Sequence, residues 1–294
     1  MKKALLSVLV YFLISQIGTG VCTVVIAMAL GMSPKGGIHV SIMMPCMIVS
    51  CAIAILVCWK GLKVMRIPET FSIANIKWGW ALTAIVATFF GIFAGNLATE
   101  MADLPNMIED MMLDSAKSIW GFLAIGILCP IAEELLFREG VCGYLARNGA
   151  RPWKAIWVSA ILFGLIHVNP AQVPFAMLLG VMLGMIYMKT GSVVVPSIIH
   201  ILNNSFAMVT IWIYGEEALD ESMVEWVGGN IPAAICIIVG FALCFFLLRK
   251  FWEQPTPSPS QREGGEKPTP NPSQREGVEL VKSEESSITD FANH

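Results

Sequence analysis

The chain has 294 residues, of which 55% are hydrophobic and only 14% are charged, with a formal net charge of -3. Soluble globular domains carry about 25% charged residues, so this composition excludes an ordinary soluble domain and indicates an integral protein of the lipid bilayer. No basic stretch typical of nucleic-acid binding is present, so we expect no nucleic-acid partner. The fold class that we predict is all-α, a polytopic membrane protein with about eight transmembrane helices.

Apolar runs long enough to cross a bilayer recur along the chain, since a membrane helix needs roughly 20 apolar residues. The first run follows Lys2 and Lys3 and continues to about Leu30, which favours an uncleaved span over a secretory signal. Pro170 and Pro174 separate the fifth run from the sixth, because proline interrupts a helix. The eight predicted spans are residues 4–31, 39–59, 78–97, 118–137, 153–169, 172–188, 192–214 and 230–248.

Charges in alternate loops separate by sign. The loops around residues 100–114 and 216–225 are acidic, whereas the loops of the other set carry Lys and Arg, among them Arg138, Arg147 and Arg151. Loops on the cytoplasmic side are enriched in Lys and Arg, so we predict that both termini are cytoplasmic. This alternation supports an even number of spans, in what we expect to be a bacterial cytoplasmic membrane.

The stretch "ILCPIAEELLFREG" at 127–140 places Glu133 and Glu134 side by side in an otherwise apolar run. A carboxylate at bilayer depth costs several kcal/mol unless it is paired, protonated or in contact with water. On a helix, Glu134 and Arg138 lie one turn apart in the order that favours an ion pair, while Glu133 points about 100° away. We therefore predict that Arg138 anchors Glu134 and that Glu133 is available as a general base. A structural ion-pair cluster at the cytoplasmic rim is the alternative.

Two histidines lie inside predicted spans, His167 in the fifth and His200 in the seventh. Phe163 stands four residues before His167, and Asn204 stands four residues after His200, in each case on the same helical face. A glutamate, two imidazoles and an amide are the groups needed to activate water and to stabilise an oxyanion. For each histidine taken alone, packing in the core is the alternative.

The three motifs together resemble the CPBP family of intramembrane peptidases, which includes the type II CAAX prenyl endopeptidases and bacterial Abi-type proteins. The family pattern is EExxxR, FxxxH and HxxxN in separate membrane helices. This sequence has "EELLFR" at 133–138, "FGLIH" at 163–167 and "HILNN" at 200–204. The resemblance covers roughly residues 118–214, and no motif position departs from the pattern.

The resemblance implies a role for each motif residue. Glu133 would activate the attacking water with help from His167. His200 and Asn204 would stabilise the tetrahedral oxyanion, while the neighbouring glutamate and Arg138 would hold the first motif in shape. Water must reach such a site, so we also expect a polar cavity among the fourth to seventh spans, opening to the cytoplasm.

The sequence leaves the use of a metal open. Glu133, His167 and His200 could supply three ligands of an open zinc site, but the zincin motif HExxH is absent. We expect no tightly bound structural metal, and a catalytic divalent metal such as zinc is the alternative. Gly180 and Gly184 form a GxxxG pattern, which lets membrane helices approach closely, so a homodimer is a further alternative.

The function implied by the resemblance is hydrolysis of a peptide bond in a membrane-associated peptide or protein. A prenylated CAAX tail is the substrate of the best-known relatives. Two alternatives belong to other classes: a non-catalytic membrane immunity or scaffold protein, and a proton-coupled transporter that uses the same buried acids.

In the simplest arrangement of the spans, the first and second motifs lie at different depths in the membrane. If the fifth span begins at the membrane surface near Lys154, His167 lies about 20 Å along it at 1.5 Å per residue. Glu133 is only five residues before Arg138, which the layout places in a cytoplasmic loop. A shared site therefore requires that the fifth helix tilts or begins below the surface, or that its first cations snorkel.

Four parts follow from these assignments. The repeat of "PTPSPSQREGG" at 255–265 as "PTPNPSQREGV" at 268–278 lies in a stretch rich in Pro, Ser and Glu, which predicts a disordered tail. The predicted parts are N-terminal spans with an outer acidic segment (1–117), a catalytic core (118–214), an outer loop with the last span (215–252), and the tail (253–294).

Overall fold

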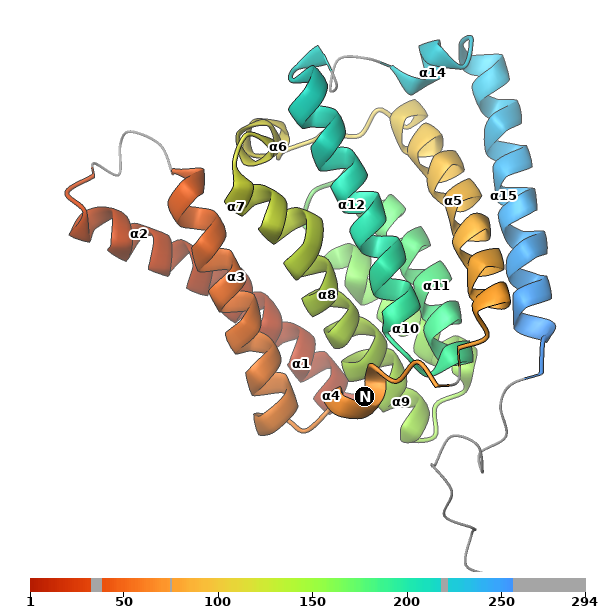
Figure 1. Cartoon of the computed structure of the whole chain (residues 1–294), viewed down its shortest axis with the longest axis horizontal. Coiled ribbons are helices and arrows are strands. Elements are labelled where there is room, and N and C mark those ends of the chain that lie inside the picture. The colour runs from red at the N-terminus through yellow and green to blue at the C-terminus, as the bar shows by residue number, and fades with distance from the viewer. Residues whose placement is uncertain (33–38, 75, 218–221, 256–294) are drawn as a thin grey trace, which may run out of the picture. The chain divides into compact units, whose positions relative to one another are not determined.

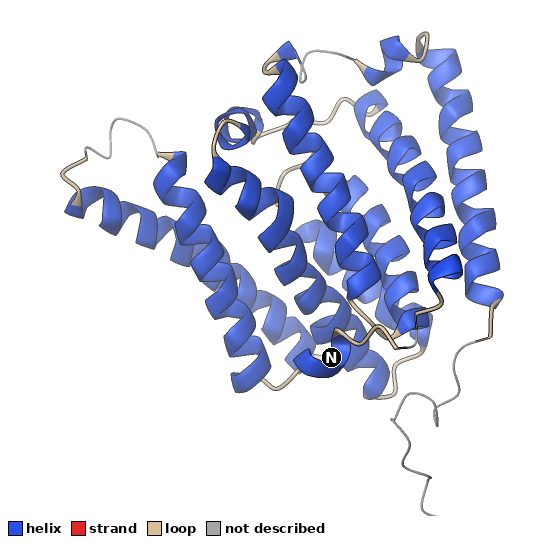
Figure 2. Cartoon of the chain, in the orientation of Figure 1, coloured by secondary structure: helices blue, strands red, loops and turns tan. Residues whose placement is uncertain are grey.

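The computed structural model describes residues 1–32, 39–74, 76–217 and 222–255, and within these ranges every regular element is a helix (Figure 2). The predicted all-α class is therefore confirmed. The chain divides into two units, Met1–Gln254 and Pro255–His294, and all the helices belong to the first. The tail was predicted to begin at Glu253, but this residue still belongs to the last helix, and the rest of the predicted tail from residue 256 lies outside the described residues.

Helical elements are labelled α, and stretches of π-helix are labelled η. They are α1 (Lys2–Phe12), η1 (Leu13–Gly18), α2 (Thr19–Ala29), α3 (Val40–Leu56), η3 (Val57–Gly61), α4 (Ile67–Thr70), α5 (Trp78–Met101), α6 (Glu109–Ala116), α7 (Ile119–Gly121), η4 (Phe122–Leu128), α8 (Cys129–Glu134), η5 (Leu135–Gly143), α9 (Tyr144–Arg147), α10 (Pro152–Leu165), α11 (Val173–Thr190), α12 (Val194–Tyr214), α14 (Met223–Trp226) and α15 (Asn230–Glu253).

Seven continuous helices in the described ranges are long and apolar enough to cross a membrane. They are Lys2–Ala29, Val40–Gly61, Trp78–Met101, Ile119–Arg147, Val173–Thr190, Val194–Tyr214 and Asn230–Glu253. The predicted span 153–169 corresponds to α10, which has 14 residues and is shorter than the roughly 20 that a bilayer requires. The predicted eight spans are thus seven full-length helices and one short one. α1 begins and α15 ends at the same end of this unit (Figure 1), as an even number of crossings requires. Which end is cytoplasmic stays a prediction.

The fourth span extends well beyond the predicted 118–137. Its helix runs without interruption over 29 residues to Arg147. Arg138 is fully buried inside it and is not a loop residue, so the loop charge pattern keeps Arg147 and Arg151 but loses this cation. The prediction was wrong here because Arg138, read as a boundary, is neutralised inside the protein by a partner on its own helix.

The same finding removes the conflict in depth. A short connection after α9 turns the chain back, so α10 runs antiparallel to η5, the usual arrangement for helices joined by a short loop. Ser159 of α10 contacts Arg138. His167 lies eight residues beyond Ser159, and Glu133 lies five residues before Arg138, so both displacements point the same way along the paired helices. The two motifs therefore approach the same depth.

The helix that carries the first motif lies in the interior of the unit. All nine residues of η5 are buried, and this segment packs against α1, α10 and α11, while α8 packs against α3 and α12. Close contact of α11 with α10 depends on the GxxxG glycines. A Cβ on Gly180 would lie 2.9 Å from Cα of Ala160, and one on Gly184 would lie 3.2 Å from Cγ2 of Ile156. The pattern thus joins two helices of one chain, and dimerisation stays an untested prediction.

Candidate active site

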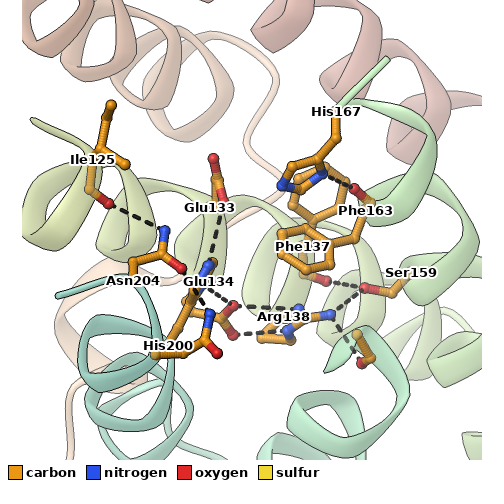
Figure 3. Close-up of polar contacts among 12 residues, drawn as sticks. Ile125, Glu133, Glu134, Phe137, Arg138, Ser159, Phe163, His167, His200 and Asn204 are labelled. Atoms are coloured by element: carbon orange, nitrogen blue, oxygen red, sulfur yellow. Dashed lines mark hydrogen bonds and ion pairs between the residues drawn. The ribbon is translucent and has the colours of Figure 1, made fainter. Parts of the chain in front are cut away.

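The predicted site residues come from three regions of the helical unit (Figure 3). Glu133 and Glu134 end α8, and Arg138 follows in η5. His200 and Asn204 lie on α12, one turn apart. His167 lies two residues past the end of α10.

Glu134 and Arg138 form the ion pair expected from their spacing, and both side chains are fully buried. Nε of Arg138 donates to Oε2 of Glu134 at 2.7 Å, and Nη2 donates to Oε1 at 3.2 Å. Nη1 donates to the carbonyl of Gly180 at 3.2 Å and to Oγ of Ser159 at 3.4 Å. Four of the five N–H groups of the guanidinium are thus bonded, and a bidentate pair with such further bonds is the arrangement in which a buried charge pair is tolerated.

Glu133 is placed differently from its neighbour. Its side chain is 19% exposed, and its carboxylate makes no hydrogen bond to any residue that the structure describes. Nε2 of His200 lies 3.7 Å from Oε2 of Glu133, which exceeds hydrogen-bonding distance. Glu133 therefore keeps its lone pairs available to accept a proton, as the helical angles predicted.

His200 lies between the two glutamates. Its Nδ1 is 3.0 Å from Oε1 of Glu134, and its Nε2 faces Glu133. An ionised carboxylate only accepts hydrogen bonds, so the contact with Glu134 requires a proton on Nδ1. The buried ion pair thus fixes both the orientation and the tautomer of the histidine that faces Glu133.

His167 is held at the end of α10 by its own turn. Its Nδ1 donates to the carbonyl of Phe163 at 2.8 Å, which leaves Nε2 as the acceptor of the neutral ring. The ring of Phe163 contacts His167 edge to face at 5.0 Å between centroids and contacts His200 at 5.6 Å. The structure records no hydrogen bond between His167 and Glu133 or His200 among the described residues, so Phe163 is what joins the second motif to the third.

The backbone after His167 is strained. Val168 has a φ of 58°, which a β-branched residue rarely adopts and which costs on the order of 1–3 kcal/mol. Asn169 compensates, because its Oδ1 accepts from the amide of Met107 at 3.0 Å and its Nδ2 donates to Asn106 at 2.8 Å. These bonds fix the loop that presents His167.

Asn204 has a partner that the sequence did not indicate. Its Nδ2 donates to the carbonyl of Ile125 in η4 at 3.1 Å, and its Oδ1 accepts from Asn203 at 3.0 Å. Asn204 therefore ties α12 to the helix that carries Glu133, and one amide hydrogen remains for another acceptor.

Sequence reasoning missed a second cluster of ionisable groups, which is centred on Glu139 of the same helix. Glu139 is 2% exposed and pairs with Nη2 of Arg147 at 2.7 Å. The hydroxyl of Tyr187 donates to its Oε2, and the backbone amide of Arg66 donates to its Oε1 at 3.1 Å. We call Glu139, Arg147, Tyr187 and Arg66 the support cluster. Its one sequence signal was an acid directly after Arg138.

Ser159 was missed as well. Its hydroxyl donates to the carbonyl of Phe137 at 2.6 Å while accepting from Arg138, so it joins α10 to η5 beside the ion pair. A single buried hydroxyl in an apolar helix was the only signal that could have identified it.

The residues considered for a metal do not form a ligand set. Among the described residues, no group of three or more His, Cys, Asp and Glu side chains could hold a metal ion. A catalytic divalent metal such as zinc therefore does not fit the side chains as placed, and we derive no step through one.

Comparison with known proteins agrees with the motifs. Residues 115–206, which include all six predicted site residues, match the profile of the family described as type II CAAX prenyl endopeptidase Rce1-like. The family resemblance predicted from the motifs is confirmed, and the match supports membrane protease activity in general.

Two curated relatives resemble this chain at modest identity. The membrane-embedded CAAX protease MroQ of Staphylococcus aureus strain USA300 is 28% identical over 147 residues, which are 48% of this chain and 59% of MroQ. The UPF0177 protein YxdF of Lactococcus lactis strain IL1403 is 26% identical over 161 residues, 51% of this chain and 85% of YxdF. The chain thus covers less than two thirds of MroQ. No solved structure matches the chain.

Proposed function

We propose that the chain is an intramembrane endopeptidase that hydrolyses a peptide bond in a membrane-associated peptide or protein, with Glu133 activating the attacking water. The contrast between two adjacent carboxylates carries the proposal. Glu134 is fully buried and bonded to Arg138 and His200, whereas Glu133 is partly exposed and faces His200 without a hydrogen bond. An acid that only stabilised the fold would be expected to share the ion pair.

The chemistry assigned to Glu133 is that of a general base and then a general acid. Its carboxylate takes a proton from water while the water oxygen attacks the carbonyl carbon of the scissile bond. The proton then passes to the leaving nitrogen as the C–N bond breaks, which regenerates the carboxylate. His167 presents an unprotonated Nε2 in the neutral ring and orients the same water by accepting its second hydrogen.

Negative charge develops on the carbonyl oxygen of the substrate and needs fixed donors. We assign this role to Nε2 of His200, in the ring form that carries both protons, and to the remaining amide hydrogen of Asn204. The bonds of these side chains to Glu134 and to Ile125 hold them in place before substrate binds. Glu134 and Arg138 act as positioning residues through His200.

A prenylated CAAX tail is the first substrate to test. The family is described as CAAX prenyl endopeptidases, and MroQ is named a CAAX protease. A synthetic farnesylated tetrapeptide tail and the same peptide without the lipid, incubated with the chain in liposomes, separate a prenyl-dependent enzyme from a general membrane peptidase. We expect release of the last three residues only from the lipidated peptide.

The function itself is tested by comparing membrane peptides in cells that produce the wild-type chain or Glu133→Gln. We expect cleavage products that disappear with Glu133→Gln while the amount of protein in the membrane is unchanged. A phenotype that needs Glu133 without any detectable product would point to a scaffold, and transport that follows an imposed proton gradient would point to a transporter.

Chelation tests the metal alternative separately. We expect the purified chain to keep its activity after incubation with 1,10-phenanthroline and dialysis against EDTA, because the side chains form no ligand set. Loss of activity that added zinc restores would contradict this expectation.

A further inference from the structure

Two thiols from separate helices meet beside the candidate active site. Sγ of Cys51 in α3 lies 3.8 Å from Sγ of Cys129, the first residue of α8. Both side chains are buried, at 5% and 8% exposure. The hydroxyl of Tyr11 in α1 donates to Sγ of Cys51 at 3.5 Å. Residues 78 positions apart are thus held in van der Waals contact through their sulfur atoms.

The thiol pair lies next to Glu133. Cys129 precedes Glu133 by four residues on one continuous helix, so the two side chains share a helical face one turn apart. A movement of α8 at Cys129 therefore moves the backbone that carries Glu133. No side chain assigned to the peptidase reaction belongs to the thiol pair.

Both thiols also line a cavity, which gives small reagents access to them. The cavity has a volume of about 360 Å³ and lies mainly between α3 and α8. Apart from the two cysteines its walls are apolar, with Ile55, Trp59 and Leu135 among them. A buried thiol without such access would be inert, whereas an apolar cavity admits a small, uncharged, membrane-permeant oxidant.

We propose that Cys51 and Cys129 are an oxidation site whose disulfide joins α3 to α8 and inhibits the chain. The effect on activity rests on the proposed protease function. The oxidant class is a hydroperoxide. One thiol attacks the peroxide oxygen, giving a sulfenic acid and water from hydrogen peroxide, and the second thiol then displaces the sulfenic oxygen as a second water. Two sulfur atoms are oxidised and one peroxide is reduced, so electrons and protons balance.

The geometry gives the direction of the effect. A disulfide requires an S–S distance of about 2.05 Å, so the two sulfur atoms must approach by about 1.8 Å from their present contact. Part of that movement falls on α8 one turn before Glu133. Because a misplacement of about 1 Å at a reacting group can reduce a rate by about 10²-fold, we expect oxidation to lower proteolysis by at least tenfold.

Peroxide treatment of the purified full-length chain in liposomes tests the proposal. We expect mass spectrometry to find the peptides that contain Cys51 and Cys129 joined, and activity to fall at least tenfold and return with dithiothreitol. Cys51→Ser and Cys129→Ser should keep their activity in peroxide. Cys58→Ser is the matched control, since Cys58 is also buried but contacts the carbonyl of Ser7. It should be inhibited like the wild type.

Two results would overturn the proposal: oxidised cysteines without any link between Cys51 and Cys129, or a complete link that leaves the rate of proteolysis unchanged. Thermal unfolding of each variant shows whether it is folded, and Cys129→Ala replaces Cys129→Ser if the serine variant is not. A wild-type chain without activity would end the proposed function, whereas the link is still detected by mass, so the two failures are distinguishable.

Discussion

Two buried carboxylates, those of Glu134 and Glu139, lie five residues apart on the helix Ile119–Arg147. Only Glu134 has an acidic neighbour, Glu133, whose carboxylate makes no hydrogen bond to a described residue. Glu134 pairs with Arg138 and orients His200, which faces the partly exposed Glu133. Glu139 pairs with Arg147 and Tyr187 in the support cluster, and no second acid lies beside it. A buried ion pair is therefore not by itself a mark of function. The feature that indicates function is an ion pair that orients a histidine toward a second carboxylate, when that carboxylate itself makes no hydrogen bond.

The largest expected effect is on stability and compares the two arginines. Arg138→Ala leaves Glu134 charged, fully buried and without its bidentate partner, which costs about 3–5 kcal/mol. Arg147→Ala should cost less, since Arg147 is 26% exposed and water can reach the remaining charge. Thermal unfolding in detergent measures both. Equal losses for the two variants would show that the clusters do not differ as described.

The next effect is on rate. His167→Ala removes the ring that we assign to orienting the water, and it should lower kcat/KM by about 10²-fold. The unfolding midpoint should change little, because the ring is half-buried and its hydrogen bond lies within its own turn. Unchanged cleavage kinetics in a folded His167→Ala variant would remove this residue from the site.

The smallest effect compares two hydroxyl groups. Ser159→Ala removes one donor to the carbonyl of Phe137, worth about 1 kcal/mol, and loosens Arg138. Tyr187→Phe removes a donor to a carboxylate, worth about 1.5–3 kcal/mol. For the same loss of unfolding free energy, Ser159→Ala should lower kcat more than Tyr187→Phe does. Of these two residues, only Ser159 contacts the ion pair that holds His200. The opposite pattern would place the support cluster in catalysis.

The sequence predicted interactions within one helix better than interactions between helices. The pair of Glu134 with Arg138 followed from a spacing of four residues, as did the outward angle of Glu133. The position of His200 between the two glutamates did not, since it depends on how α12 packs against α8. The bond of Asn204 to Ile125 was missed for the same reason.

Boundaries were predicted less well, for an electrostatic reason. Arg138 and Glu139 indicated the end of a span, but each is neutralised inside the protein, and the helix continues to Arg147. Hydropathy counts such residues as charges, whereas a paired and hydrogen-bonded ion behaves as part of the core. The sequence also did not show that α10 is too short for a full span. The apolar run continues past Leu165 to Val168, whereas the helix ends at Leu165.

The most direct measurement compares Glu133→Gln with Glu139→Gln, two isosteric changes on one helix, by peptide cleavage per folded molecule in liposomes. We expect Glu133→Gln to fold like the wild type and to cleave at least 10³-fold more slowly, beyond the about 10²-fold minimum for a general base. We expect Glu139→Gln to be less stable and yet to cleave at close to the wild-type rate. Cleavage by Glu133→Gln at the wild-type rate would contradict the role of Glu133 as the general base.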